Sequence, residues 1–595
     1  MYYWFNLQYM LKNQKSRRLA KWIGGILLGL VVIIGIASIY INAKWKPLLT
    51  EKIKEGVYEG SNRLYKIDFN DIHLNLITGS VILDSISLYP DSVVFNELKA
   101  VKKAPTHLFR LKLAHLKIGG VGILKAYFSK NVKVNSIVLD HPSIDMVYHK
   151  VPKNTDTIKD ERTLYQQISK SLKSIRVNDI KVIDANFDYY NGLKKLNAIK
   201  HLSINVKDVL IDSMAQFDTT RVFHSRDVGF NMTGYSSLTA DKMYTIKVDT
   251  VNGSISNKTL RVVGVQLIPM YPDLEFSRKY KVGKDRYDLK FDEISLSGVD
   301  FIGLNNDGNL HAKRLNIGPA KVAVFLNREL PPPAFDKGRN YPHNALKRLE
   351  MQTLIDTLTL NKVDIAYTEY NEKTKERGTL TLDNLSGQIV NITNDSTRLA
   401  TKNHAYADLT TYVMGAGKLN VKIDFNLTDK NSSFSYIGHV NPFNLKVLNP
   451  LSRSLGLVAI ESGNVKSVDF NINANQNGSS GTVKFLYNDL NVNLLKENDN
   501  GIKEKKGLLS FLANTVLIKN DNPTQGEAAR TANITFSRAP QASFFNIMWK
   551  SVFTGIREIV GLGIVPMKSP PEPKSKAKTE RQQKRAERRA ERAKN

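Results

Sequence analysis

The stretch that decides the fold is Ile137-Val-Leu-Asp-His-Pro-Ser-Ile-Asp-Met-Val-Tyr148, in which two runs of alternating apolar residues meet at one offset. Alternation with a period of two is typical of a β-strand that has one apolar and one polar face. The step from Leu139 to Pro142 is three residues, which would turn the second run over. The stretch therefore predicts two strand segments joined at a bulge or corner that keeps one face apolar.

The same form recurs three more times along the chain. It returns at residues 180–189, 315–324 and 358–367. The first and second copies, and likewise the third and fourth, are 43 residues apart when counted from their first residues. A repeat at a fixed spacing indicates that one structural unit is used more than once.

Alternation of this kind extends from about residue 65 to residue 540. It predicts a mainly β protein in which an N-terminal transmembrane helix precedes an elongated, curled antiparallel β-sheet with a few short helices. Within this body, the candidate amphipathic helices that could cover the sheet are few and lie near 160–174, 344–352 and 442–454. A long sheet with one apolar face must be covered by a second sheet, by helices or by a ligand. With so few helices, we expect the sheet to curl into a sandwich or into an open groove with an apolar floor.

The N-terminus has the pattern of a membrane anchor. Residues 22–41 contain no charge, and at ~1.5 Å per residue they would span the ~30 Å hydrocarbon core. We expect a transmembrane signal anchor at 22–43, preceded by a short basic cytoplasmic segment at 1–21, with the body on the other side of the membrane. The alternative is a cleaved signal peptide, whose apolar region is normally shorter.

The composition excludes several kinds of chemistry. The 595 residues include no cysteine, so thiolate catalysis, disulfides and zinc–thiolate sites are ruled out. None of the 11 histidines has the i, i+4 spacing of a helical zinc site, and no phosphate-binding loop or nucleophile elbow is present. We therefore expect a non-enzymatic protein with no catalytic residues, no metal and no cofactor.

The net charge of +29 favours anionic partners. Phospholipids or other acyl lipids are the better candidates. Nucleic acid is not expected, because the Pro-rich and then basic tail at 566–595 lacks aromatic residues for base stacking. We expect that tail to be disordered.

The segment 541–565 predicts an amphipathic aromatic helix. Phe545, Trp549, Phe553 and Ile556 fall on one stripe, which suits a helix that lies in the membrane interface. The alternative is a helix that caps the open end of the sheet, and one helix could do both.

Two parts of the chain resemble a known family. After the anchor and a short helix, Tyr65-Lys-Ile-Asp-Phe-Asn-Asp-Ile-His-Leu-Asn-Leu-Ile-Thr-Gly79 resembles the opening of AsmA-like proteins, and so does the unit at 139–144. Residues 459–470 and 481–490 resemble the C-terminal region of that family. The resemblance divides the repetitive body, 44–540, into an N-terminal part at about 44–330 and a C-terminal part at about 354–540.

The resemblance implies a single-pass inner-membrane protein of a diderm bacterium whose bulk lies in the periplasm. Its sheet would form a taco-shaped groove related to the bridge-like lipid transfer proteins. The implied function is lipid binding or lipid transfer that contributes to outer-membrane phospholipid homeostasis, with an outer-membrane or envelope protein as a further candidate partner at the far end. The alternative is an envelope assembly scaffold for outer-membrane or secreted proteins, which would pair with client strands. The family has no catalytic residues to carry over.

The apolar positions that we expect to line such a groove come from the alternating runs. They are Ile67, Phe69, Leu74, Leu76, Ile137, Leu139, Ile144, Met146, Ile180, Val182, Phe187, Leu315, Ile317, Val322, Leu358, Leu360 and Ile365.

Overall fold

The computed structural model describes Gly25, Gly29 and residues 45–75, 78–122, 129–151, 163–169, 172–372, 374–456, 458–497, 503–505 and 518–561. The predicted anchor, apart from those two glycines, and the predicted tail lie outside these residues. Among the described residues, no helix has the length and apolar character needed to cross a membrane. The chain forms two compact units, with Met1–Gln266 and Glu293–Lys313 in unit 1 and Leu267–Asp292 and Arg314–Asn595 in unit 2.

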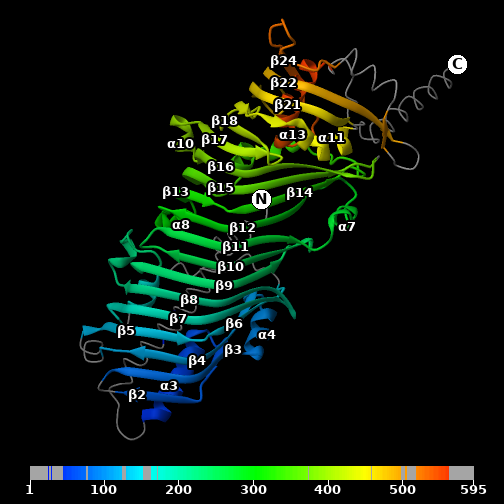
Figure 1. Cartoon of the computed structure of the whole chain (residues 1–595). Helices are drawn as coiled ribbons and strands as arrows, with labels where there is room; N and C mark the ends of the chain where they lie inside the picture. The colour runs from blue at the N-terminus through cyan, green and yellow to red at the C-terminus, as the bar shows by residue number, and fades with distance from the viewer. Residues whose placement is uncertain are drawn as a thin grey trace, which may run out of the picture. The chain divides into compact units, whose positions relative to one another are not determined.

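Unit 1 is a curled, mostly antiparallel sheet with short helices (Figure 1). Its strands are β1 Tyr65–Asp68, β2 Asp71–Asn75, β3 Ser80–Pro90, β4 His107–Gly119, β5 Asn131–Asp140, β6 Ser143–Tyr148, β7 Ser174–Asn191, β8 Lys194–Ile211, β9 Asp227–Leu238 and β10 Tyr244–Ser254. Its helices are α3 Trp45–Gly60, α4 Ser92–Ala100, α6 Leu164–Ile168 and α8 Phe301–Asn306. Strands β11 Thr259–Pro269, β12 Arg286–Ser297 and β13 Leu310–Ile317 have residues in both units.

Unit 2 is also built of strands and short helices. Its strands are β14 Ala320–Asn327, β15 Thr353–Tyr370, β16 Arg377–Thr393, β17 His404–Val413, β18 Gly417–Asn426, β19 Phe434–Val440, β20 Phe443–Asn444, β21 Val458–Ala474, β22 Gly478–Glu497, β23 Lys503–Lys505 and β24 Thr531–Ser537. Its helices are α7 Asp273–Arg278, α9 Pro342–Lys347, α10 Ser396–Thr401, α11 Asn449–Gly456 and α13 Phe544–Ile559. The prediction of a mainly β protein built on an antiparallel-rich sheet is confirmed.

The 43-residue repeat is seen in the structure as parallel strand neighbours. Ile137 of β5 lies directly beside Ile180 of β7, and Val322 of β14 lies directly beside Ile365 of β15. The sheet departs from the predicted antiparallel pairing at β5–β7, β6–β7 and β14–β15, where the described strands run parallel. The reason is that two copies of one pattern bring equivalent apolar positions together on one face when they run in the same direction and in register.

The predicted bulges lie where the alternating runs meet. The register between β7 and β8 shifts between Val182 and Ala185, and the register between β15 and β16 shifts between Leu360 and Val363. The backbone turns through the left-handed region there, with φ of 55° at Asp184. Asp tolerates this conformation better than most residues, because its short side chain can form local hydrogen bonds. The bulge prediction is confirmed at these two copies.

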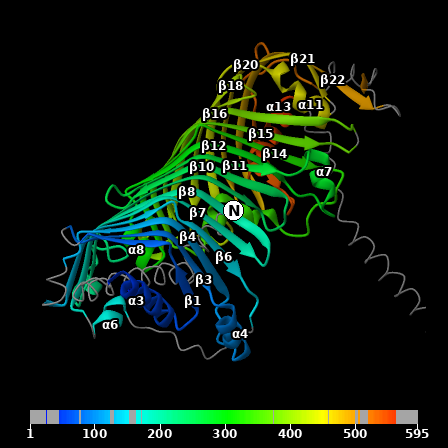
Figure 2. The same ribbon diagram turned by 90° about the horizontal axis from the view of Figure 1, so that it is seen from below.

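Each unit has its own hydrophobic core beneath one helix. In unit 1, α3 lies against the inner face of the curved strands (Figure 2) and contributes Leu49, Ile53 and Val57, which recur at helical spacing. In unit 2, α13 packs on β22 and β24 and contributes Ile547 and Ile559 to the core. The helices that begin and end the described body therefore cover part of the apolar face of their own unit.

Gly387 of β16 offers a test of the bulged sheet. Its φ is +143°, and a Cβ atom there would lie 2.1 Å from the carbonyl oxygen of Asp408 on β17. We expect Gly387→Ala to lower the free energy of unfolding by at least about 2 kcal/mol, because backbone atoms on both strands must shift. Chemical denaturation followed by circular dichroism measures the change.

The matched control is Gly526→Ala. Gly526 also has a positive φ, 81°, but has nothing within 4 Å of the added Cβ. Gly526→Ala should lower the free energy of unfolding by only about 1 kcal/mol, which is the conformational strain of a side chain at positive φ. Equal losses in the two variants would show that the close approach of β16 to β17 is not as described.

Candidate functional site

An apolar row crosses the sheet of unit 1 from strand to strand. Ile118, Ile137, Ile180, Val206 and Val228 are direct cross-strand partners on β4, β5, β7, β8 and β9. Direct partners share one face of a sheet, so their side chains form a continuous apolar surface. The first two are 1% and 2% exposed, whereas the last three are only partly buried. The surface is thus fully covered near α3 and becomes accessible away from it.

Unit 2 has an equivalent apolar row across its strands, and the residues at one end of this row are buried. Leu358, Ile389, Ala407, Ile423 and Tyr436 are direct partners on β15 to β19. Leu358 and Ile389 are partly buried, but Ala407 is 3% exposed and Tyr436 is 1% exposed. The covering element at that end is α13, whose Met548 carbonyl oxygen accepts a hydrogen bond of 3.1 Å from the Tyr436 hydroxyl. In both units, one apolar face is therefore covered at one side and partly open at the other.

Helix α13 packs against the sheet through a face of small and apolar residues. The hydroxyls of Ser551 and Ser479 are 2.6 Å apart in a buried hydrogen bond. A Cβ atom on Gly555 would lie 2.5 Å from the Cβ of Val483, so the helix approaches β22 closely. The capping role that the sequence left open is therefore seen in the structure.

The predicted membrane-interface stripe lies beside that packed face. Phe553 is 40% exposed, while Phe545, Trp549 and Ile556 are partly buried. Contact of these residues with a membrane interface stays a prediction.

A charged group ends the apolar face of β15. Glu369 follows Ile365 and Tyr367 on the same face, since alternate residues of a strand point the same way. Arg328 donates two hydrogen bonds to Glu369, one of them 3.0 Å long from Nε. Burial by itself would raise the pKa of Glu369, but the Arg328 guanidinium outweighs it and holds that pKa below its usual value. Burial also raises the pKa of Tyr367 well above its usual value.

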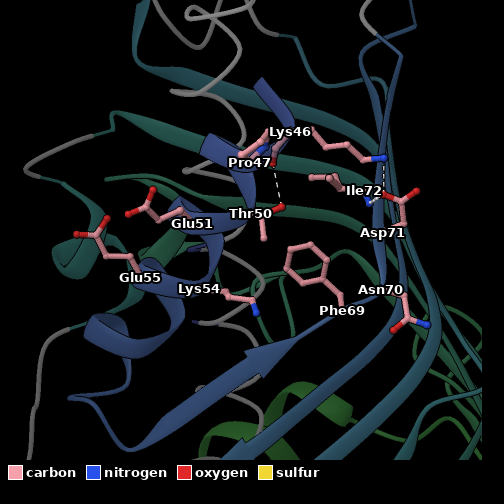
Figure 3. A pocket seen from close by; sticks show the side chains of 10 residues that line it. All are labelled: Lys46, Pro47, Thr50, Glu51, Lys54, Glu55, Phe69, Asn70, Asp71 and Ile72. Atoms are coloured by element: carbon pink, nitrogen blue, oxygen red, sulfur yellow. Dashed lines mark hydrogen bonds and ion pairs between the residues drawn. The ribbon is translucent and has the colours of Figure 1, made fainter. Parts of the chain in front are cut away.

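A pocket of about 670 Å³ lies in unit 1 between α3 and the first strands (Figure 3). Phe69 and Ile72 line its apolar side, and Lys46 lies on its rim at 2.5 Å from the Asp71 carboxylate. The hydrogen bond from Lys46 lowers the pKa of Asp71. The pocket therefore combines an apolar floor, which includes one of the predicted groove residues, with a charged entrance. Its other lining residues are Pro47, Thr50, Glu51, Lys54, Glu55 and Asn70.

The predicted groove residues differ in how much of their surface is accessible. Three of them are core residues: Ile67, Ile137 and Leu139. Leu76 lies outside the described residues. The others are partly buried and are Phe69, Leu74, Ile144, Met146, Ile180, Val182, Phe187, Leu315, Ile317, Val322, Leu358, Leu360 and Ile365.

The structure brings several predicted groove residues together across neighbouring strands. Ile144 of β6 lies beside Phe187 of β7, and Leu139 of β5 lies beside Val182 of β7. Sequence reasoning missed the continuation of the face onto β8 and β9, where Phe230 packs over Gly253. The apolar residues at the alternate positions 228 and 230 are the sequence signal from which this continuation could have been predicted.

Histidines and aspartates pair across neighbouring strands on the polar side of the sheet. His115 lies 2.7 Å from Asp84, and His439 lies 2.6 Å from Asp469. In the part of the chain that the structure describes, no group of three or more His, Asp or Glu residues is arranged to hold a metal ion.

His343 of α9 is a buried imidazole beneath the cap of unit 2. It is 2% exposed and its ring centroid lies 5.4 Å from that of Phe425. Burial lowers the pKa of His343 to about 4, with a smaller contribution from Lys347. The folded chain therefore favours the neutral ring.

The sign of the resulting pH dependence follows from proton linkage. The stability that depends on neutral His343 is present above the unfolded pKa of ~6.5 and is lost as the pH falls towards about 4, with a limiting slope of ~1.4 kcal/mol per pH unit. We expect His343→Phe, which suits the aromatic surroundings, to remove that part of the slope. Denaturation midpoints measured between pH 7.5 and 4.5 on both proteins test this. Parallel curves would contradict it.

Comparison of the chain with protein-family models gave no match, and neither did comparison with curated proteins.

Proposed function

We propose that this chain is a membrane-anchored lipid-binding protein of the cell envelope that takes part in lipid transfer. Residues 22–41 would hold it in the inner membrane, and its body would lie in the periplasm and contribute to outer-membrane phospholipid homeostasis. The observation that carries the proposal is the pair of apolar faces, each covered by one helix at one side and partly open at the other. The proposed location rests on the anchor pattern and on the resemblance to AsmA-like proteins.

The physical argument concerns the cost of exposing an acyl chain to water. That cost is ~0.8 kcal/mol per CH₂, so a chain of about 16 carbons costs over ~10 kcal/mol. The row from Ile118 to Val228 crosses five strands, which at ~4.8 Å per strand is about 19 Å. An apolar surface of that extent can shield much of a chain without specific contacts, so it accommodates passing lipids rather than one fixed ligand.

A charge placed on the open part of the face tests the proposal. We expect Val228→Asp to reduce the phospholipid that co-purifies with the full-length chain several-fold, because a carboxylate there must be desolvated when an acyl chain lies over it. Organic extraction and mass spectrometry measure the lipid, and circular dichroism checks the fold.

Asn231→Asp is the matched control. It lies on the same strand, is exposed and points to the opposite face, so bound lipid should not change. A photo-crosslinker placed at Val228 gives a readout that does not depend on the aspartate variant. Crosslinks to protein instead of lipid, or a wild-type chain that carries no lipid, would contradict lipid binding and favour the scaffold alternative.

A further inference from the structure

The apolar face of unit 2 leads from β12, β14 and β15 to a charged end. Leu289, Val322, Ile365 and Leu382 are direct partners in one apolar row. The next row along the strands places Val324 beside Tyr367. Arg328 and Glu369 lie beyond it. Along the strands the surface is therefore first apolar and then charged, which matches the acyl chain and the charged headgroup of a lipid.

Both oxygens of the Glu369 carboxylate at this end already accept hydrogen bonds. Glu369 accepts two hydrogen bonds from Arg328 and a third, of 2.8 Å, from the Tyr367 hydroxyl. The nearby Asp285 is held by Lys337, whose ammonium lies 2.9 Å from it. Each carboxylate therefore has a cationic partner: Arg328 for Glu369, and Lys337 for Asp285.

Lys550 of α13 brings a further cation to the same place. Phe545, five residues earlier on the same helix, has its ring centroid 6.3 Å from that of Tyr367, so the first part of α13 lies beside the end of the apolar rows. The Lys550 ammonium lies 5.7 Å from the Trp549 ring centroid, and no described carboxylate forms an ion pair with it. Burial, and then the positive charge of Arg328, lower the pKa of Lys550, and the Glu369 carboxylate raises it by a smaller amount.

An excess cation in partly desolvated, apolar surroundings is costly unless an anion joins it. We infer that Arg328 and Lys550 bind the anionic headgroup of a membrane lipid, through its phosphate, while an acyl chain of that lipid lies along the row of Val322 and Ile365. Arg328 keeps donors that Glu369 does not occupy, and a guanidinium beside an ammonium suits a phosphate that presents several acceptor oxygens. This inference rests on the proposed function and adds a headgroup preference to it.

Uptake of two fluorescent lipids by the full-length chain tests the inference. The probes are phosphatidylglycerol, which is anionic, and phosphatidylcholine, which is zwitterionic, each offered at the same level in otherwise identical vesicles. We expect the wild-type chain to take up phosphatidylglycerol about 5–10-fold better, because the choline cation of phosphatidylcholine already neutralises its phosphate, and we expect Lys550→Gln to reduce the ratio of the two uptakes to about one. Lys466→Gln removes an exposed charge from the same unit and should leave the preference intact.

A second variant separates ligand binding from a structural role. Lys550→Met keeps the length and apolar stem of the side chain and removes the charge. If Lys550 binds a headgroup, this variant loses the preference and is at least as stable as the wild type. If Lys550 instead serves as an internal counter-ion of Glu369, the variant is destabilised, which would overturn the inference.

The remaining outcomes distinguish the two proposals. A wild-type chain that takes up neither lipid contradicts the proposed function. Equal uptake of both lipids, or an unchanged preference in Lys550→Gln, contradicts the headgroup site and leaves the proposed function standing. Competition by soluble glycerol 3-phosphate at the same concentration as the lipid would assign the site to a free phosphate compound instead of a lipid.

Discussion

The structure of each unit depends on the need to shield the apolar face of its sheet. Direct cross-strand partners such as Ile137 and Ile180 place apolar side chains in rows that pass from strand to strand without interruption. Such rows stabilise the sheet only where water is excluded. In each unit, one helix keeps water away from part of the apolar face. The helix α3 packs on β1 and joins the core of unit 1, and α13 packs on β22 and β24.

The two covering helices differ in how they meet the sheet. The helix α3 uses large apolar residues, of which Ile53 is fully buried. The helix α13 uses Ser551 and Gly555, so its backbone comes close to β22 and its aromatic residues are left at the side. That choice of small residues is what leaves Phe553 accessible and what brings Lys550 to the end of the apolar rows.

Much of the fold could be predicted from alternation alone. Period-two patterns predict the strands, and the three-residue step predicts the bulges at Asp184 and Leu360, because any other arrangement would turn apolar residues into water. The direction of pairing was not predictable, since one pattern satisfies a parallel or an antiparallel neighbour equally well. The buried stripe of α13 was missed because hydrophobicity points to Trp549 and Phe553, whereas close packing selects the smaller residues. The charged end was missed because Arg328, Glu369 and Lys550 are distant in the chain.

The in-register pairing of repeated copies has a consequence for how such a chain can vary in length. Each copy recognises its neighbour through equivalent positions, as Val322 does Ile365, and the bulges of the two copies come side by side. A duplicated copy would find the same partner surface that the original found, and the strands further along would keep their pairing. Growth by whole copies therefore preserves the apolar rows, whereas insertion of a single residue within a strand would reverse the side chains that follow it.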